Sequence, residues 1–193
     1  YQEAFTMLKG HDKGEVPSMV REAWKLASIL RRNRYAKGAL DLDFPEVRAV
    51  MDKDGRVTDI ITEEYDESHQ LIEECMLAAN EAVALTLKNR NRPTIYRVHE
   101  EPDSAKLFEF GQLCKLYGHP VHDIGQRQYL NELMKSIKGS PDEQLLKLAL
   151  LKSLMRARYD TEPLGHYGLA TANYCHFTSP IRRYADLVVH RSL

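Results

Sequence analysis

Two adjacent arginines near the end of the chain are the residues best suited to bind an anion. Arg182 and Arg183 follow a polar turn that contains Thr178, Ser179 and Pro180. If Pro180 is the first residue of a helix, its missing N–H costs no hydrogen bond, and Thr178 or Ser179 can cap the free backbone donors. Both arginines then lie in the first turn, where the helix dipole favours negative charge. Because cations are normally favoured at the other end of a helix, the pair predicts a phosphate site.

The residues that follow supply an acidic partner and an apolar stripe. Helical spacing places Asp186 and His190 on the same face as Arg182, so Asp186 could hold Arg182 in position. Four apolar residues are expected to face the core: Ile181, Ala185, Val188 and Val189. A plain surface helix with an Arg182–Asp186 ion pair is an equally open interpretation of the spacing.

Composition fits a globular protein but lacks the basic excess that nucleic-acid binding usually requires. At 193 residues and 43% hydrophobic content, the chain suits one domain or a large part of one, and its formal net charge is −1. Residues 21–37 are nevertheless rich in arginine and lysine, whereas residues 63–74 are acidic. The basic stretch could line a path for an RNA backbone, and the more common meaning of such a run is a solvated helix face.

Apolar runs and cysteines limit the class of protein further. No apolar run is long enough to span a membrane and none has the pattern of a signal peptide, so we expect a cytoplasmic protein without a membrane partner. The three cysteines, Cys75, Cys114 and Cys175, are odd in number and lack the paired spacing of a zinc site. We therefore expect free thiols.

Periodicity and turn signals predict a mixed α+β fold that is rich in helix. Helices are expected over residues 20–34, 67–87, 104–117, 126–137 and 140–156, and short strands over residues 93–98, 157–162 and 166–170. The Asp54-Gly55 step between residues 47–51 and 57–61 predicts a β-hairpin. The helix over residues 67–87 is apolar nearly all round in its second half, which predicts a central buried element.

Several motifs together resemble a known catalytic domain. Residues 176–187, His-Phe-Thr-Ser-Pro-Ile-Arg-Arg-Tyr-Ala-Asp-Leu, with residues 165–170 before them and 190–191 after them, resemble the signature of the RNB domain of ribonuclease II and ribonuclease R exoribonucleases. Residues 38–46, 68–69 and 72–84 resemble the ribonuclease R branch in order and spacing. The resemblance implies that residues 1–193 are the C-terminal portion of a single RNB catalytic domain, helix-rich with a β-hairpin and short strands, without the cold-shock, S1 and aspartate-motif regions.

This resemblance implies hydrolysis of RNA from its 3′ end to nucleoside 5′-monophosphates. The expected partner is a single-stranded RNA 3′ end, and the expected parent enzyme is monomeric. The family's divalent metal, Mg²⁺, is held by aspartates upstream of the matched segment, so we expect no metal ligand and no cofactor in this chain. The chain alone is accordingly expected to be inactive.

The resemblance also assigns roles to individual residues. Arg182 is expected to be catalytic, holding the scissile phosphate and offsetting charge in the transition state. Thr178, Ser179 and Arg183 are expected to contact RNA. By register, Glu73 is expected to accept hydrogen bonds from the hydroxyls of the terminal ribose. The alternatives are that the neighbouring Glu74 makes this contact, or that Glu73 is only a first-turn carboxylate favoured by the helix dipole.

Other polar residues are expected to be structural. Asp41 and Asp43 share one face of an extended segment and could form half of a magnesium site, but so close to Pro45 they are more often solvated or capping groups. Cys175 and His176 are adjacent on an extended segment, point to opposite faces and so make no catalytic dyad. Three further residues are expected to be partners of buried elements: Asn80, His166 and Tyr174.

Some members of the RNB family clamp the terminal base of the RNA with an aromatic residue that aligns near Asp41, and this chain has no aromatic at that position. Two alternatives to an exoribonuclease stay open. One is a non-catalytic RNA-binding or regulatory module with a degenerate RNB fold. The other is a protein-interaction domain without an RNA role, which the motif at residues 176–187 disfavours.

Overall fold

The computed structural model of this protein describes residues 1–42, 44, 46–63 and 65–193. The chain divides into two compact units, residues 1–30 with 43–75 and residues 31–42 with 76–193. Two of the boundaries between them fall within long helices, one in α2 (Glu15–Ala36) and one in α3 (Glu67–Asn89). The observed mixture of many helices and two short antiparallel strand pairs confirms the predicted fold class.

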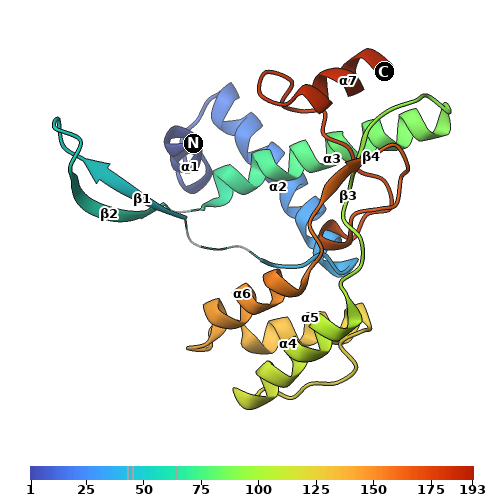
Figure 1. Cartoon of the computed structure of the whole chain (residues 1–193). Coiled ribbons are helices and arrows are strands. Elements are labelled where there is room, and N and C mark those ends of the chain that lie inside the picture. Colours follow the sequence, from blue (N-terminus) through green and yellow to red (C-terminus); the bar gives the residue numbers. More distant parts are fainter. Residues whose placement is uncertain (43, 45, 64) are drawn as a thin grey trace. The chain divides into compact units, whose positions relative to one another are not determined.

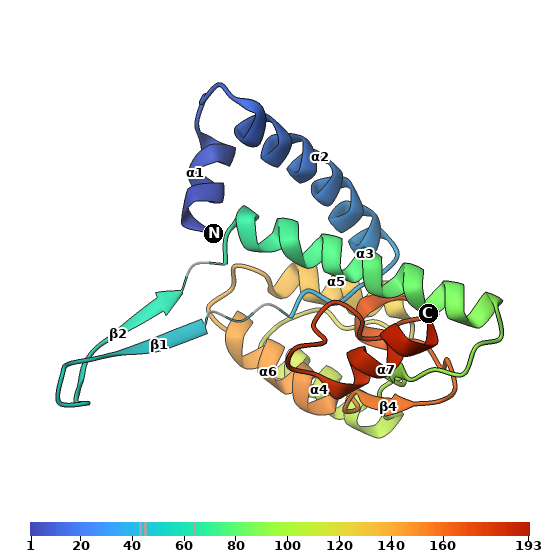
Figure 2. The same ribbon diagram turned by 90° about the horizontal axis from the view of Figure 1, so that it is seen from above.

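The first unit begins with a pair of helices. Helix α1 (Gln2–Lys9) ends at a turn that reverses the chain into α2 (Figure 2). Arg21, one of the basic residues of the 21–37 stretch, fixes this turn, because its guanidinium donates to the carbonyl oxygens of Met7 at 3.0 Å and Asp12 at 2.9 Å. Arg21 therefore has a structural role.

A β-hairpin forms at the predicted Asp-Gly turn. Strand β1 (Glu46–Met51) pairs antiparallel with β2 (Val57–Glu63), and Figure 1 shows the two strands side by side, joined by a turn. The carboxylate of Asp52 accepts hydrogen bonds from the backbone N–H groups of Asp54 and Arg56, both at 2.9 Å. Gly55 has φ +78°, a conformation that glycine adopts without a steric penalty. Turn chemistry thus closes the hairpin as predicted.

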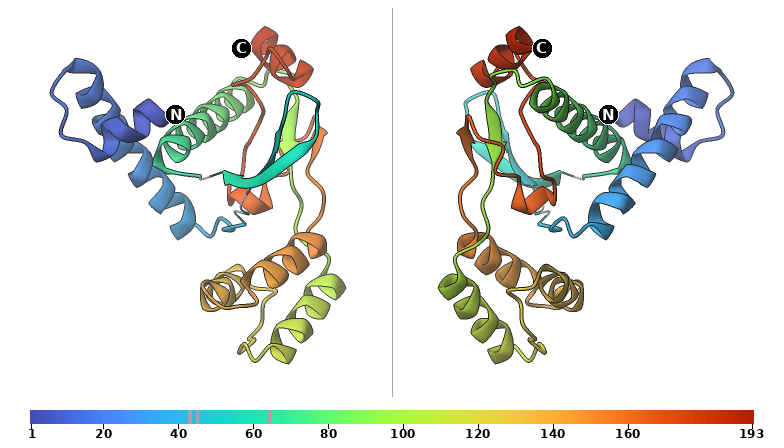
Figure 3. Two further views of the ribbon diagram at one scale, coloured as in Figure 1. Left: turned by 90° about the vertical axis from the view of Figure 1, so that its left-hand side faces the viewer. Right: turned by 90° about the vertical axis from the view of Figure 1, so that its right-hand side faces the viewer.

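Three helices form one lobe of the second unit (Figure 3): α4 (Ser104–Leu116), α5 (Arg127–Ile137) and α6 (Glu143–Ser153). Asp103 caps α4 by accepting the N–H groups of Ala105 and Lys106 at 2.9 and 3.1 Å. Their shared core is apolar and includes Leu107, Phe110, Cys114, Leu130, Leu133, Ile137, Leu146 and Leu150. Helix α6 begins at Glu143, three residues later than predicted, because the Glu143 carboxylate bonds back to the Gly139 N–H at 2.7 Å over a turn.

A second core surrounds the strand pair β3 (Tyr96–Val98) and β4 (Arg158–Asp160). Helix α7 (Tyr184–Ser192) and the C-terminal part of α3 contribute to it, and its buried members are Ala84, Leu87, Tyr96, Val98, Cys175 and Val189. The Arg97 N–H donates to the Tyr174 carbonyl at 2.9 Å, so the segment that leads to α7 lies along β3. Both views of Figure 3 show this segment, residues 171–177, between β3 and α3.

Two predictions about elements are wrong. Residues 166–170 form no strand: Tyr167–Leu169 is a 3₁₀ turn, η1, because the His166 side chain accepts the Leu169 N–H and Ala170 adopts φ +53°. Helix α3 is buried along one side only, since Ala84 and Leu87 are fully buried whereas Cys75 and Leu85 are exposed. The apolar residues around α3 therefore led to a prediction of more complete burial than the helix has.

Candidate functional site

The turn before α7 differs from the predicted helix start. Helix α7 begins at Tyr184 with Arg183 as its N-cap residue, and no side chain caps it. The backbone N–H groups of Arg182 and Arg183 both donate to the Ser179 carbonyl, at 3.3 and 3.2 Å. Pro180 is thus in a turn outside the helix, and neither arginine lies in the first helical turn. The prediction that both arginines lie in the first turn of the helix, next to the positive end of its dipole, is therefore wrong.

Asp186 organises the turn. Its carboxylate is fully buried and accepts three hydrogen bonds: Oδ1 from the Ser179 N–H at 2.8 Å and Arg183 Nη2 at 2.7 Å, and Oδ2 from Arg183 Nε at 2.7 Å. Burial by itself would raise the pKa of Asp186, yet the bonds from Arg183 and Ser179 hold this pKa below its usual value. The carboxylate stays charged and joins the turn to α7. Its partner is Arg183, so the predicted pair of Arg182 with Asp186 is wrong.

Arg182 is left exposed by this pairing. Its side chain makes no hydrogen bond or ion pair within the part of the chain that the structure describes. Ile181 beside it is 99% exposed, so the prediction that Ile181 faces the core is wrong, whereas Val189 is fully buried as predicted. The turn therefore presents a guanidinium at the surface with no internal ion-pair partner among the described residues.

The other side of the turn is held by His190. Its Nε2 donates to the Phe177 carbonyl at 2.9 Å, and the two rings stack with their centroids 4.1 Å apart. The Thr178 hydroxyl oxygen is buried and has no hydrogen-bond partner among the described residues. Ser179 contributes through its backbone, as donor to Asp186 and acceptor from both arginines. The predicted site residues Thr178, Ser179, Arg182 and Arg183 therefore lie on one turn.

The segment that enters this turn carries aromatic side chains that pack against one another and against other uncharged aromatic residues. The rings of His166 and Tyr174 meet edge to face, as do those of Tyr174 and His176, and the Tyr159 hydroxyl lies 2.8 Å from His176 Nδ1. Burial, aided by nearby positive groups, lowers the pKa of His166 to about 3 and the pKa of His176 to about 4. Both imidazoles are neutral near pH 7, so they do not compete with Arg182 for an anion.

Cys175 and Asn80 behave as predicted. The Cys175 thiol is fully buried and donates to the Asn80 carbonyl at 3.3 Å, and burial raises its pKa to about 12. A neutral, enclosed thiol cannot act as a nucleophile. The Asn80 side chain bonds to the Tyr174 hydroxyl and to the Phe177 N–H, which confirms its structural role.

Glu73 and Glu74 lie in the part of α3 that belongs to the first unit. Glu73 is partly exposed and accepts a hydrogen bond from the Tyr65 hydroxyl, whereas Glu74 is buried. Because α3 begins at Glu67, Glu73 lies beyond the first turn, where a helix dipole has little effect. The alternative of a first-turn carboxylate is wrong for Glu73.

Metal ligands do not converge in the described residues. Within residues 1–42, 44, 46–63 and 65–193, no three His, Cys, Asp or Glu side chains lie close enough to hold a metal ion. Asp41 is engaged elsewhere, since its Oδ2 accepts from Lys138 Nζ at 2.9 Å. Asp43 lies outside the described residues. The described residues therefore offer no set of ligands that fits a divalent cation.

Among the same residues, no helix is both long enough and apolar enough to cross a membrane.

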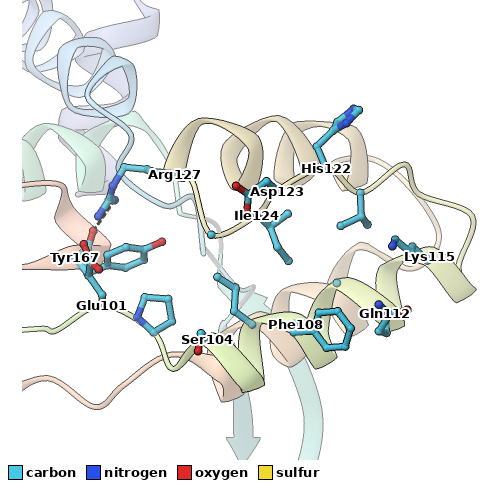
Figure 4. Close-up of a pocket in the computed structure, with 15 residues that line it drawn as sticks. Glu101, Ser104, Phe108, Gln112, Lys115, His122, Asp123, Ile124, Arg127 and Tyr167 are labelled. Atoms are coloured by element: carbon cyan, nitrogen blue, oxygen red, sulfur yellow. Dashed lines mark hydrogen bonds between the residues drawn. The ribbon is translucent and has the colours of Figure 1, made fainter.

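A cavity of about 540 Å³ lies elsewhere in the second unit, between α4 and residues 121–127 (Figure 4). At one end of this cavity Arg127 covers the Tyr167 ring, 3.9 Å from its centroid, and donates to the carbonyl oxygens of Gly38 and Tyr167. The lining mixes apolar side chains such as Phe108 with polar ones. It includes none of the predicted site residues.

Comparison with known proteins gives the family of this chain. The family model described as the RNB domain matches residues 1–193. The chain is 40% identical to the ribonuclease R of Thermotoga maritima, with 91% of this chain and 25% of the relative covered. It is 37% identical to the ribonuclease R of Aquifex aeolicus, covering all of this chain and 28% of the relative.

A solved structure shows the same fold. The Mycoplasma genitalium RNase R in complex with ribose-methylated single-stranded RNA superimposes with a TM-score of 0.91 at 28% identity, covering 100% of this chain and 31% of that one. The chain thus spans between a quarter and a third of the length of these three proteins. The match of the family model over the whole sequence, together with the shared fold, shows that this chain belongs to the RNB domain family.

Proposed function

We propose that the complete protein is an exoribonuclease that hydrolyses RNA from its 3′ end and releases nucleoside 5′-monophosphates. The observation that carries this proposal is the exposed Arg182 on a turn whose other charges are internally paired. Relatives named ribonuclease R and an RNase R structure bound to single-stranded RNA support it. The chain itself forms part of the catalytic domain.

Arg182 holds the scissile phosphate. A guanidinium offers a planar pair of N–H donors that matches two phosphate oxygens, and a charge-assisted pair of this kind strengthens as negative charge grows in the transition state. The bidentate Arg183–Asp186 pair keeps Asp186 from competing for Arg182. Because the turn is fixed before RNA arrives, little reorganisation is needed at the moment of reaction.

Four further residues are proposed to contact RNA. Ser179 and Thr178 belong to the turn that approaches the phosphate backbone. Arg183 uses its Nε and Nη2 for Asp186, which leaves the Nη1 donors for RNA. Glu73 accepts hydrogen bonds from the ribose hydroxyls of the terminal nucleotide, which distinguish RNA from DNA. The proposed partner is a single-stranded RNA 3′ end.

Divalent metal chemistry belongs to residues outside this chain. Hydrolysis in the RNB family depends on Mg²⁺, and the described residues offer no set of ligands that fits it. The complete protein is proposed to be monomeric and cytoplasmic, with the metal ligands in the remainder of its catalytic domain. The 193-residue chain alone is accordingly inactive.

Substitution of Arg182 tests the proposal. In the complete protein, Arg182→Ala should lower single-turnover cleavage of 5′-labelled RNA by roughly a hundredfold or more, with a much smaller change in RNA affinity. Arg182→Lys should restore little, because lysine lacks the planar fork. The matched control is Arg156→Ala, another exposed arginine, which should cleave normally. A normal rate for Arg182→Ala contradicts the proposed role.

The alternative of a non-catalytic RNA-binding module gives a different result in the same assay. The complete protein would then bind RNA yet release no shortened products in the presence of Mg²⁺. The same incubation with the 193-residue chain alone should give no ladder of products. A ladder abolished by EDTA would mean that this chain holds its own metal.

A further inference from the structure

The Asn80 side chain lies where α3 meets the segment that leads into the Arg182 turn. Asn80 is 3% exposed, and its two polar atoms reach two residues of that segment. Its Oδ1 accepts the Phe177 N–H at 2.9 Å, and its Nδ2 donates to the Tyr174 hydroxyl at 3.1 Å. The Asn80 backbone carbonyl also accepts from the Cys175 thiol at 3.3 Å. One residue of α3 thus bonds to three of the four residues from 174 to 177.

Phe177 is the point from which the turn departs, and it is held from two directions. Asn80 binds its N–H from α3, while His190 binds its carbonyl at 2.9 Å and stacks on its ring from α7. At the other end of the turn, Asp186 holds Ser179 and Arg183. The short stretch that carries Arg182 is therefore held by hydrogen bonds on both sides. The bond between the Asn80 side chain and the Phe177 N–H joins the start of the turn to α3.

We propose that Asn80 is a positioning residue for Arg182. It fixes the position of the turn relative to α3, so that the Arg182 guanidinium can contact the scissile phosphate. This proposal rests on the proposed function of Arg182. Asn80 itself is buried and cannot touch RNA. Its effect on cleavage passes through the Phe177 N–H, five residues before Arg182, and a displacement of about 1 Å in a positioned group can cost about a hundredfold in rate.

An asparagine suits this task for a chemical reason. Its amide offers an acceptor to a backbone N–H and a donor to a hydroxyl at the same time, so both buried groups are satisfied without a buried charge. Alanine would leave the Phe177 N–H and the Tyr174 hydroxyl without these partners. Aspartate would keep the acceptor for Phe177, and the Tyr174 hydroxyl can turn to donate to it.

A double-mutant cycle in the complete protein tests the proposal. The rates of single-turnover RNA cleavage are measured for wild type, Asn80→Ala, Arg182→Ala and the double variant, together with RNA affinity and melting temperature. Asn80→Ala should lower the rate about tenfold or more while RNA affinity changes less than about threefold. In the Arg182→Ala background, the same substitution should lower the rate less than about twofold further, because residues that act as a unit are not additive.

Two further variants separate position from stability. Tyr174→Phe removes the other partner of Asn80 but keeps the Phe177 bond, so it should lower the melting temperature while the rate stays within about twofold of wild type. Asn80→Asp should recover part of the rate lost in Asn80→Ala, because it still accepts the Phe177 N–H. If Asn80→Ala does not fold, Asn80→Ser carries the same cycle.

The outcomes distinguish this proposal from the proposed function. If Arg182→Ala is slow but Asn80→Ala slows wild type and Arg182→Ala by the same factor, or leaves both unchanged, Asn80 does not act through Arg182 and this inference fails alone. If Arg182→Ala cleaves at the wild-type rate, the role of Arg182 fails, and the positioning role of Asn80 fails with it.

Discussion

Arg182 and Arg183 are chemically identical neighbours with different environments. Arg183 makes two bonds of 2.7 Å to the buried carboxylate of Asp186, whereas Arg182 projects into solvent. Asp186 lies three positions after Arg183 and four positions after Arg182, and either spacing is compatible with a pair on one face of a helix. The choice was made by the start of α7 at Tyr184, which leaves Arg182 in the preceding turn. A single residue of helix register thus decided which arginine is available to a ligand.

Glu73 and Glu74 give a prediction at the same scale. In the complete protein, Glu73→Gln should slow single-turnover cleavage of RNA by the equivalent of about 1.5–3 kcal/mol, which is the contribution of a hydrogen bond to a charged acceptor. The melting temperature should stay nearly unchanged. Glu74→Gln should instead lower the melting temperature, because Glu74 is buried. Single-turnover cleavage and thermal melting are measured side by side. A cleavage defect confined to Glu74→Gln would show that the assignment to Glu73 is wrong.

The connection after α2 shows how an element depends on one glycine. Gly38 has φ +99°, and a Cβ atom there would lie 2.5 Å from Cδ of Arg127, the side chain that bonds to the Gly38 carbonyl. Leu40 then donates its N–H to the Gly168 carbonyl at 3.0 Å. The end of α2 is thereby joined to α5 and η1 within the second unit.

Substitution of Gly38 should lower the free energy of unfolding more than substitution of a glycine with no atoms close to the added Cβ. Gly38→Ala should destabilise the 193-residue chain by roughly 2 kcal/mol or more, because strain at positive φ adds to the collision with Arg127. Gly55→Ala is the matched control: its φ is +78° but no atom lies within 4 Å of the added Cβ, so it should cost about 1 kcal/mol. Urea unfolding measures both, and equal losses would contradict the role of crowding.

At the scale of the whole chain, the buried histidines predict a loss of stability in acid. Burial lowers the pKa of His166 to about 3 and the pKa of His176 to about 4, from a usual value of 6.5. Below pH 6.5 the unfolded chain therefore binds protons that the folded chain does not, so the stabilisation is complete above pH 6.5 and is lost as the pH falls toward 4.

Between pH 6.5 and pH 4, the free energy of unfolding should fall with pH by about 1.4 kcal/mol per pH unit for each of the two histidines. Chemical unfolding of the 193-residue chain at several pH values from 7.5 to 5 measures it. His166→Asn should flatten the slope, whereas a substitution of His11, an exposed histidine, should not. An unfolding free energy that does not change between pH 7 and pH 5 would count against neutral buried imidazoles.

The sequence by itself determined the family, the hairpin and most helices. Short-range chemistry was sufficient for these, since the Asp-Gly turn and the periodic apolar residues act within a few positions of the chain. It also brought the residues of one motif together, because Thr178 to Arg183 are neighbours along the backbone. The 3₁₀ turn at Tyr167–Leu169 was missed because it depends on the His166 side chain and a left-handed Ala170, for which no periodic signal exists.

Only the tertiary structure decided which groups of the motif are available. Asp186 is buried, and a buried carboxylate must be paired, so it took the nearest donors, Arg183 and the Ser179 N–H. Helix α7 begins at Tyr184, so Arg182 lies in the preceding turn and is exposed to solvent. The link from Asn80 to Phe177 spans 97 residues, and a contact of such sequence separation leaves no local pattern from which it could be predicted. Burial and long-range hydrogen bonding, which exist only in the folded chain, therefore set the geometry of the site.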